Sequence, residues 1–387
     1  MITKQTIEEY KNDVSKILNV PLEKISKIKE VSWLEKLEKG TKSKLYEVIV
    51  TLNKNKSTSL ILKEYDLNAL DLGGNNILKE LITEKALLTT AKKYNLENIF
   101  PRILSENYEP FNHKNALLVE TVSANTLEQL LSAKNFMNLP YSEILVRQNR
   151  AINNSLEISS RFYDIFPEHK ERIEAEMKNL SNGKFDKIDQ KNSAEYTKSF
   201  GGYLGGLFGF PEINKGKENF SSLIEEYWTD YADIIHDCYP FNMAPDTFID
   251  LGNIKNGPIA LQIGCLLGYP SVFDVLSSKK NDRTFFSSVS FFANRYNNNR
   301  HNHNNHTIKN PEQFAKGALV GAIYGNIRVA AGLKARHGEE YINNIMSLLY
   351  TSKSQAKMLG NEAKPIYDLL SADLDKEEIN YQQLELF

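Results

Sequence analysis

The 387-residue sequence has little of what marks secreted, membrane-spanning or nucleic-acid-binding proteins. Its two cysteines, Cys238 and Cys265, are too few for a disulfide framework, and its polar start, MITKQTIEEY, lacks the apolar core of a secretory signal. Apolar runs such as residues 317–325 are far shorter than the roughly 20 residues that a membrane span requires. A net charge of −2 supplies no general field for nucleic acid or an anionic membrane. These absences predict a cytoplasmic protein without a nucleic-acid or membrane partner.

What remains is an ordinary globular composition. Hydrophobic residues make up 41% and charged residues 25% of the chain, close to the average for soluble domains. A chain of 387 residues is also long enough for two or three domains and a sizeable core. The function therefore has to be sought in local motifs.

One stretch, residues 234–252, places an aspartate, an asparagine and a second aspartate close together: Asp237, Asn242 and Asp250. A turn at Pro240 separates the first two, and the β-prone pair Phe248-Ile249 leads to the third. Such a set suits phosphoryl transfer, in which one carboxylate orients the attacking hydroxyl and oxygen ligands hold magnesium against the nucleotide phosphates. Asp and Asn around a proline are equally ordinary turn formers, so the pattern alone leaves both interpretations open.

The runs Asp237-Cys-Tyr-Pro-Phe-Asn242 and Ile249-Asp250-Leu251-Gly252 resemble the catalytic and metal-binding loops of the aminoglycoside phosphotransferase and choline kinase group. The resemblance implies a protein-kinase-like fold, with Asp237 as the catalytic aspartate and Asn242 and Asp250 as magnesium ligands. Three departures accompany it. The family's histidine usually lies two residues before the aspartate, where this chain has Ile235. The segment between Asn242 and Asp250 is short, and Gln262 lies where the family often has a structural aspartate.

The pattern upstream predicts a helix over residues 3–18, then strands over 31–37, 44–52 and 59–65, and a helix over 77–94. In kinase-like folds a glycine turn between the first strands lies over the nucleotide phosphates, and a lysine on the third strand reaches them. Gly40 and Lys63 occupy these places here. Hairpin glycines and solvent-facing strand lysines are common as well, so the order of the motifs carries the prediction.

Two further positions follow from the same resemblance. A carboxylate of helix 77–94 is expected to pair with Lys63, and of Glu80 and Glu84 we favour Glu84. The segment LLVETVSANTLEQLL is similar to the family's linker between lobes, whose backbone takes the adenine, so the main chain from Glu120 to Val122 is a candidate cofactor-binding segment. The predicted fold is therefore α+β and bilobal: residues 1–123 form a nucleotide-binding lobe with a small antiparallel sheet, and 124–387 form a mainly helical lobe.

Three segments carry weaker signals. The glycine-rich run at 200–211 lacks the Gly-Lys-Ser/Thr of a Walker loop and is predicted to be a packed apolar loop rather than a ligand site. His301, His303 and His306 lie in an Asn-rich run, where a surface loop is more common than a metal site. The acidic residues from Asp373 to Glu385 are compatible with a cationic substrate, but also with an ordinary acidic terminus.

The sequence thus predicts an ATP- and Mg²⁺-dependent phosphotransferase acting on the hydroxyl of a small molecule, such as a sugar, an amino alcohol or an aminoglycoside-like compound. Two alternatives remain open: a kinase of peptide Ser or Thr, and a nucleotide-binding pseudokinase, which the three departures would suit.

Overall fold

The structure is a computed structural model. The residues it describes are 4–30, 43–53, 56–67, 77–96, 99–106, 108–109, 115–120, 126–132, 139–209, 213–244, 247–248, 250–279, 281, 283–300 and 307–374. The predicted strand at 31–37, the turn with Gly40, residue Val122, the three histidines at 301–306 and the acidic terminus beyond residue 374 lie outside these ranges.

The fold is α+β, and the chain divides into two compact units. Unit 1 comprises residues 1–124, 169–187 and 246–253, and unit 2 comprises 125–168, 188–245 and 254–387. Unit 1 therefore includes two short segments from the range 124–387 that the sequence analysis assigned to the second lobe. One of them carries Asp250.

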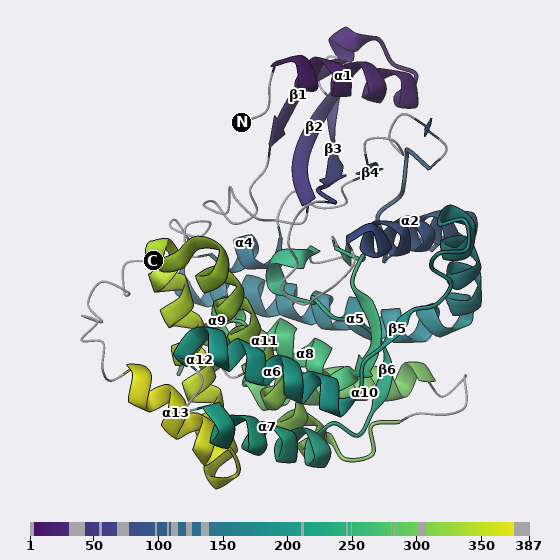
Figure 1. The fold of residues 1–387 in the computed structure, drawn as a ribbon. Helices are drawn as coiled ribbons and strands as arrows, with labels where there is room; N and C mark the ends of the chain where they lie inside the picture. The colour runs from purple at the N-terminus through teal and green to yellow at the C-terminus, as the bar shows by residue number, and fades with distance from the viewer. Residues whose placement is uncertain are drawn as a thin grey trace. The chain divides into compact units, whose positions relative to one another are not determined.

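Unit 1 is built on a four-stranded antiparallel sheet in the order β1-β2-β3-β4 (Figure 1). One face packs against the first helix and forms a core with Tyr46, Leu62 and Leu118. The elements are α1 (Lys4–Leu18), the 3₁₀ helix η1 (Leu22–Lys24), β1 (Ile25–Glu30), β2 (Ser43–Asn53), β3 (Lys56–Tyr65), α2 (Ile77–Lys93), β4 (Ala116–Glu120) and the short strand β8 (Thr247–Phe248).

Strand β1 is an element that the sequence analysis did not predict. Its two buried residues, Ile25 and Ile28, are three apart rather than two, so the segment lacks the alternation of a half-buried strand. An irregularity in the pairing with β2, between Ile25 and Lys27, lets both isoleucines face the same core. Residues 100–104 form no strand of their own and pair with β4 through a single bridge, between Ile103 and Val119.

Unit 2 is mainly helical around a small sheet in the order β5-β9-β6. Helix α5 begins in this unit, and its residues from 169 onward belong to unit 1. The elements are α4 (Leu127–Leu131), α5 (Tyr141–Leu180), β5 (Asp189–Gln190), α6 (Ser193–Phe208), α7 (Ile213–Tyr227), β6 (Tyr231–Ile235), η3 (Pro240–Asn242), β7 (Met243–Ala244), β9 (Ile254–Pro258), α8 (Ile259–Leu267), α9 (Pro270–Ser277), α10 (Phe285–Arg300), α11 (Pro311–His337), η4 (Gly338–Tyr341), α12 (Ile342–Leu359), η5 (Gly360–Ala363) and α13 (Lys364–Leu374).

Helix α11 is the central helix of unit 2 and packs against α6, α7, α8, α10 and α12 (Figure 1). It begins as the sequence predicts, with the Asn310 side chain accepting from the backbone N–H of Gln313. Its approach to α8 needs glycine: a Cβ on Gly321 would lie 2.7 Å from the Cα of Leu261. This close contact fixes α11, and with it the side chains it presents, against the elements around β6.

The glycine-rich run was predicted to be a loop, and that prediction is wrong. Residues up to Phe208 lie in α6, which is capped at its start by Asn192. Of its glycines, Gly201 lies against the Lys217 side chain of α7, and Gly209 ends the helix with a φ of 85°. Among the described residues no single helix is long and apolar enough to cross a membrane, although the bent pair α8 and α9 meets that test jointly and is largely buried.

Candidate active site

The first group of predicted site residues lies in unit 1, around Lys63. Side chains alternate along β3, so Leu60 and Leu62 enter the core under α1 while Lys63 points to the opposite face. There its Nζ lies 2.8 Å from Glu84 Oε2 on α2 and 2.9 Å from Asp250 Oδ1. The expected ion pair between the strand lysine and a helix glutamate is present, and its partner is Glu84.

This cluster holds one cation and two carboxylates. Burial raises the pKa of Glu84 to about 7, with Lys63 acting against this shift and Asp250 adding to it. Burial alone would lower the pKa of Lys63, but Asp250 and Glu84 together raise it above its usual value. The Tyr65 hydroxyl also donates to Glu84 Oε2. With both acids ionised, Lys63, Glu84 and Asp250 together have a net charge of −1.

The loop that carries Asp250 is held against α2 by the two residues that follow the aspartate. The Leu251 backbone hydrogen-bonds Glu84. Gly252 lies so close to the first turn of α2 that a Cβ there would be 3.0 Å from the Glu80 carbonyl oxygen. Asp250 is the more accessible acid of the cluster, with 38% of its side chain exposed.

The second group lies in unit 2, where β6 ends and a tight turn begins. The backbone carbonyl of Asp237 accepts from the Tyr239 N–H and from Asn242 Nδ2, both at 2.8 Å. Pro240 opens the 3₁₀ helix that carries Asn242. Because Nδ2 is held by the backbone, Asn242 keeps its Oδ1 as an available oxygen ligand.

The Asp237 carboxylate does not stand alone, because Arg328 of α11 pairs with its Oδ1. The same guanidinium nitrogen lies 2.9 Å from His236 Nδ1. Burial, and then Arg328, holds the pKa of His236 well below its usual value, so the imidazole is neutral and Nδ1 accepts the hydrogen bond. His236, which alternation would turn away from Asp237, is thus linked to it through Arg328.

Gln262 anchors the chain just before this turn. Its Oε1, at the buried start of α8, accepts from the Ile235 backbone N–H and from the Tyr163 hydroxyl, each at 2.8 Å. A neutral amide therefore satisfies a buried backbone donor that would otherwise be unpaired. Gln262, which lies where the kinase family that the sequence resembles often has an aspartate, thus supplies a hydrogen-bond acceptor without a negative charge.

Of the linker residues, Glu120 ends β4, and its backbone N–H already donates to the Arg102 carbonyl. Its side chain lies 3.7 Å from Arg102 and is 43% exposed. Only its carbonyl is left for a nucleotide base, and Val122 lies beyond the described part of the chain.

Arg328 is the residue that sequence reasoning missed. It lies 91 residues from Asp237 in the chain, so no local motif connects the two. A signal was nevertheless present, since Arg328 is the only charged residue between Lys316 and Lys334, on a helix that is otherwise apolar there. A lone charge in a buried helix needs a partner.

The oxygen donors at Asn242 and Asp250 suit magnesium, which takes one or two protein carboxylates and completes its shell with water and phosphate. No group of three or more His, Cys, Asp or Glu side chains that could hold a metal by itself exists within the described ranges. Asn242 in unit 2 and Asp250 in unit 1 thus each offer an oxygen of the kind that magnesium prefers.

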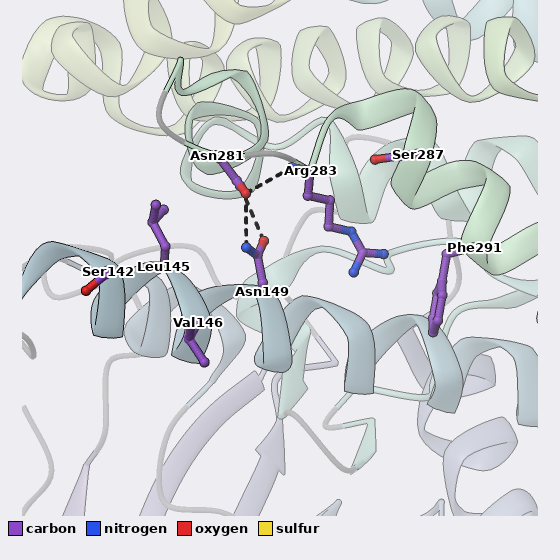
Figure 2. Close-up of a pocket in the computed structure, with 8 residues that line it drawn as sticks. All are labelled: Ser142, Leu145, Val146, Asn149, Asn281, Arg283, Ser287 and Phe291. Atoms are coloured by element: carbon purple, nitrogen blue, oxygen red, sulfur yellow. Dashed lines mark hydrogen bonds between the residues drawn. The ribbon is translucent and has the colours of Figure 1, made fainter.

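A cavity of about 540 Å³ in unit 2 is a separate feature (Figure 2). One wall is the first part of α5, where Asn149 hydrogen-bonds Asn281, and the other carries Arg283 with its guanidinium over Phe291. None of the predicted site residues lines it. Its lining residues are Ser142, Leu145, Val146, Asn149, Asn281, Arg283, Ser287 and Phe291.

Comparison of the chain with protein-family models and with curated protein sequences gives no match. Solved structures do match. The chain is similar to a choline kinase from Cryptosporidium parvum Iowa II, with a TM-score of 0.52, 10% identity, and 95% of this chain and 99% of that chain covered. It is also similar to a mutant of aminoglycoside 2'-phosphotransferase-IIIa in complex with GDP, with a TM-score of 0.50, 12% identity, and coverage of 92% and 99%. The chain thus shares the α+β fold of these kinases, as the resemblance in its sequence predicted.

Proposed function

We propose that the protein is an ATP- and Mg²⁺-dependent phosphotransferase that phosphorylates a hydroxyl group of a small molecule. The observation that carries this proposal is the cluster of Lys63, Glu84 and Asp250. Three residues distant in sequence converge there as phosphate anchoring and metal binding require. The names of the two similar structures, a choline kinase and an aminoglycoside phosphotransferase bound to GDP, support small-molecule acceptors and nucleotide use.

In this proposal Lys63, oriented by Glu84, binds the α- and β-phosphates, and Asp237 orients the acceptor. The acceptor oxygen attacks the γ-phosphorus, the bond from that phosphorus to the β–γ bridging oxygen breaks, and its electron pair leaves with ADP. The hydroxyl proton passes to Asp237, late in a largely dissociative transition state. Asn242 and Asp250 would hold Mg²⁺, which neutralises developing charge on the phosphates.

A second candidate is a nucleotide-binding protein without turnover. The ion pair between Arg328 and Asp237 favours it, because a neutralised carboxylate is a weaker proton acceptor. Turnover then requires Asp237 to be shared between Arg328 and the acceptor hydroxyl.

Two measurements on the full chain test the proposal. ATP binding by calorimetry with and without Mg²⁺ establishes nucleotide use, and ADP release with a panel of sugars, amino alcohols and aminoglycosides establishes transfer. Mg²⁺-dependent binding with acceptor-dependent ADP release is the expected result. Binding without release under any acceptor favours the second candidate, and the absence of nucleotide binding rejects both.

A further inference from the structure

A lysine in unit 2, between β5 and α6, has contacts that no part of the proposed chemistry uses. Lys191 Nζ lies 3.0 Å from Ser199 Oγ and 3.3 Å from the Tyr324 hydroxyl, and 4.5 Å from the ring centre of Tyr196. All these partners are neutral. In the described part of the chain no carboxylate oxygen lies within ion-pair distance of it.

Lys191 belongs to the surroundings of Asp237. The Tyr196 ring beneath its ammonium stacks on His236, with ring centres 5.9 Å apart, and Tyr324 also contacts the His236 ring. Tyr324 lies one turn of α11 before Arg328, the partner of Asp237. Lys191 and Asp237 are both partly exposed, and Asp237 is close enough to act on the pKa of Lys191, whereas the tyrosine rings are buried.

The other charges nearby already have partners. Arg328 is paired with Asp237, and Lys255 on β9 lies opposite Asp189 of β5. Glu195 is engaged with the backbone N–H of Asn192 at the start of α6. Lys191 is therefore the cation of this group that can serve an incoming anion.

Its protonation state matches that role. Burial, then repulsion by Lys255 and Arg328, lowers the pKa of Lys191 to about 7, while Glu195 and Asp237 act against this shift. The tyrosines that face it, Tyr196 and Tyr324, have pKa values raised by burial and stay neutral. An anion bound at Nζ would favour the charged lysine, so its binding takes up a proton near pH 7.

We propose that Lys191 binds an anionic group of the acceptor, so that the substrate is a hydroxyl compound carrying a phosphate or a carboxylate. This deepens the proposed function and rests on it. Lys191 is the cation beside Asp237 that has no carboxylate partner among the described residues, so it would attract an anionic group of the acceptor and repel a cationic one.

The test uses acceptors that differ only in charge: glycerol, glycerol 3-phosphate, glycerate and choline. ADP release is measured with the full-length wild type, with Lys191→Met, and with Lys198→Met as a control that removes an exposed lysine of α6. We expect kcat/KM to be at least tenfold higher for an anionic acceptor than for glycerol. Lys191→Met should raise the KM for that acceptor by roughly 10- to 100-fold, the worth of a charged hydrogen bond, and change the KM for glycerol, which has no anionic group, by a much smaller factor. Comparing glycerol 3-phosphate with glycerate shows whether the anionic group is a phosphate or a carboxylate.

A binding measurement keeps the inference independent of turnover. Calorimetry of glycerol 3-phosphate and glycerate near pH 7.5, in two buffers of different ionisation enthalpy, should reveal net proton uptake by the wild type that Lys191→Met lacks. Preference for glycerol or choline, absence of binding by both anions, or an equal loss of turnover with all acceptors in Lys191→Met overturns the inference. Failure of the proposed function is distinct, because it appears as absent ATP binding or as ATP binding without ADP release for any acceptor.

Discussion

The two clusters that carry the candidate chemistry have opposite charge imbalances. In unit 1, Lys63 faces two carboxylates, Glu84 and Asp250, and burial with mutual repulsion raises the pKa of Glu84 to about 7. In unit 2, Asp237 is paired with Arg328, and Lys191 nearby has its pKa lowered. The first cluster is completed by a cation and the second by an anion. Each imbalance indicates what the cluster binds, and substitutions that reverse it test the comparison.

The largest effect is expected from Lys63→Met, which leaves the unit 1 cluster with carboxylates alone. Removing one partner of the buried Lys63–Glu84 pair should cost about 3 kcal/mol of unfolding free energy, and turnover should fall steeply as the phosphate anchor is lost. Chemical denaturation and ADP release measure both. Lys44→Met, which removes an exposed lysine of β2, is the matched control. Unchanged turnover in Lys63→Met would remove Lys63 from the site.

Asp237→Asn keeps the shape of the unit 2 cluster and removes its negative charge. We expect turnover to fall by roughly 10²-fold or more, the typical contribution of a positioned acid or base, with nucleotide affinity near the wild-type value. Steady-state kinetics and calorimetry separate the two effects. Asp233→Asn, in the middle of β6, should match the wild type. A fully active Asp237→Asn would place the catalytic group elsewhere.

Asp250→Asn tests the carboxylate excess directly, because it leaves Lys63 paired with Glu84 only. The Mg²⁺ concentration for half-maximal activity should rise by roughly tenfold or more. Removing a group that only orients a metal ligand typically lowers metal affinity by roughly 10- to 100-fold, and removing the ligand itself should lower it at least as much. The metal-free protein should melt close to the wild type, because the lost attraction between Asp250 and Lys63 is offset by the removed repulsion between Asp250 and Glu84. A normal Mg²⁺ titration would make this loop purely structural.

The smallest effect concerns His236. Its pKa in the folded protein lies well below its usual value, so below about pH 6.5 the unfolded chain takes up a proton that the folded one refuses, and stability falls as pH falls. Between pH 6.5 and 5.5 this costs about 1 kcal/mol. His236→Asn keeps an acceptor for Arg328 without the titration. Denaturation at the two pH values should show a shallower pH dependence in this variant.

The contrast also separates what the sequence could predict from what it could not. The unit 1 cluster was accessible because each residue lies in a strong local pattern: Lys63 on an apolar strand and Glu84 on a long helix four residues after the alternative, Glu80. The strand and the helix follow from spacing within single elements, where periodicity is informative. The α+β bilobal fold and the pairing of Lys63 with Glu84 were predicted from the resemblance to kinase-like folds.

The unit 2 cluster depends on contacts between distant segments. Arg328 reaches Asp237 only because α11 packs closely on α8, an approach that glycines such as Gly321 permit. Lys191 lies in the short turn before α6, and residues of α6 are its neighbours. Because α6 is rich in glycine, the sequence analysis predicted a loop there instead of a helix. Strand β1 was missed because a pairing irregularity, not alternation, orients Ile25 and Ile28. Such features follow from tertiary packing, which overrides local propensity.

Gln262 has a consequence for how the protein tolerates changing solution conditions. The amide that holds the Ile235 backbone bears no charge and does not titrate, so neither acid nor salt weakens the hydrogen bond that fixes the approach to Asp237. A carboxylate at this position would have to be desolvated and would release the loop on protonation. We therefore expect acid to lower activity by protonating titrating side chains, while the loop that carries Asp237 stays in position. Activity should then recover without delay when neutral pH is restored.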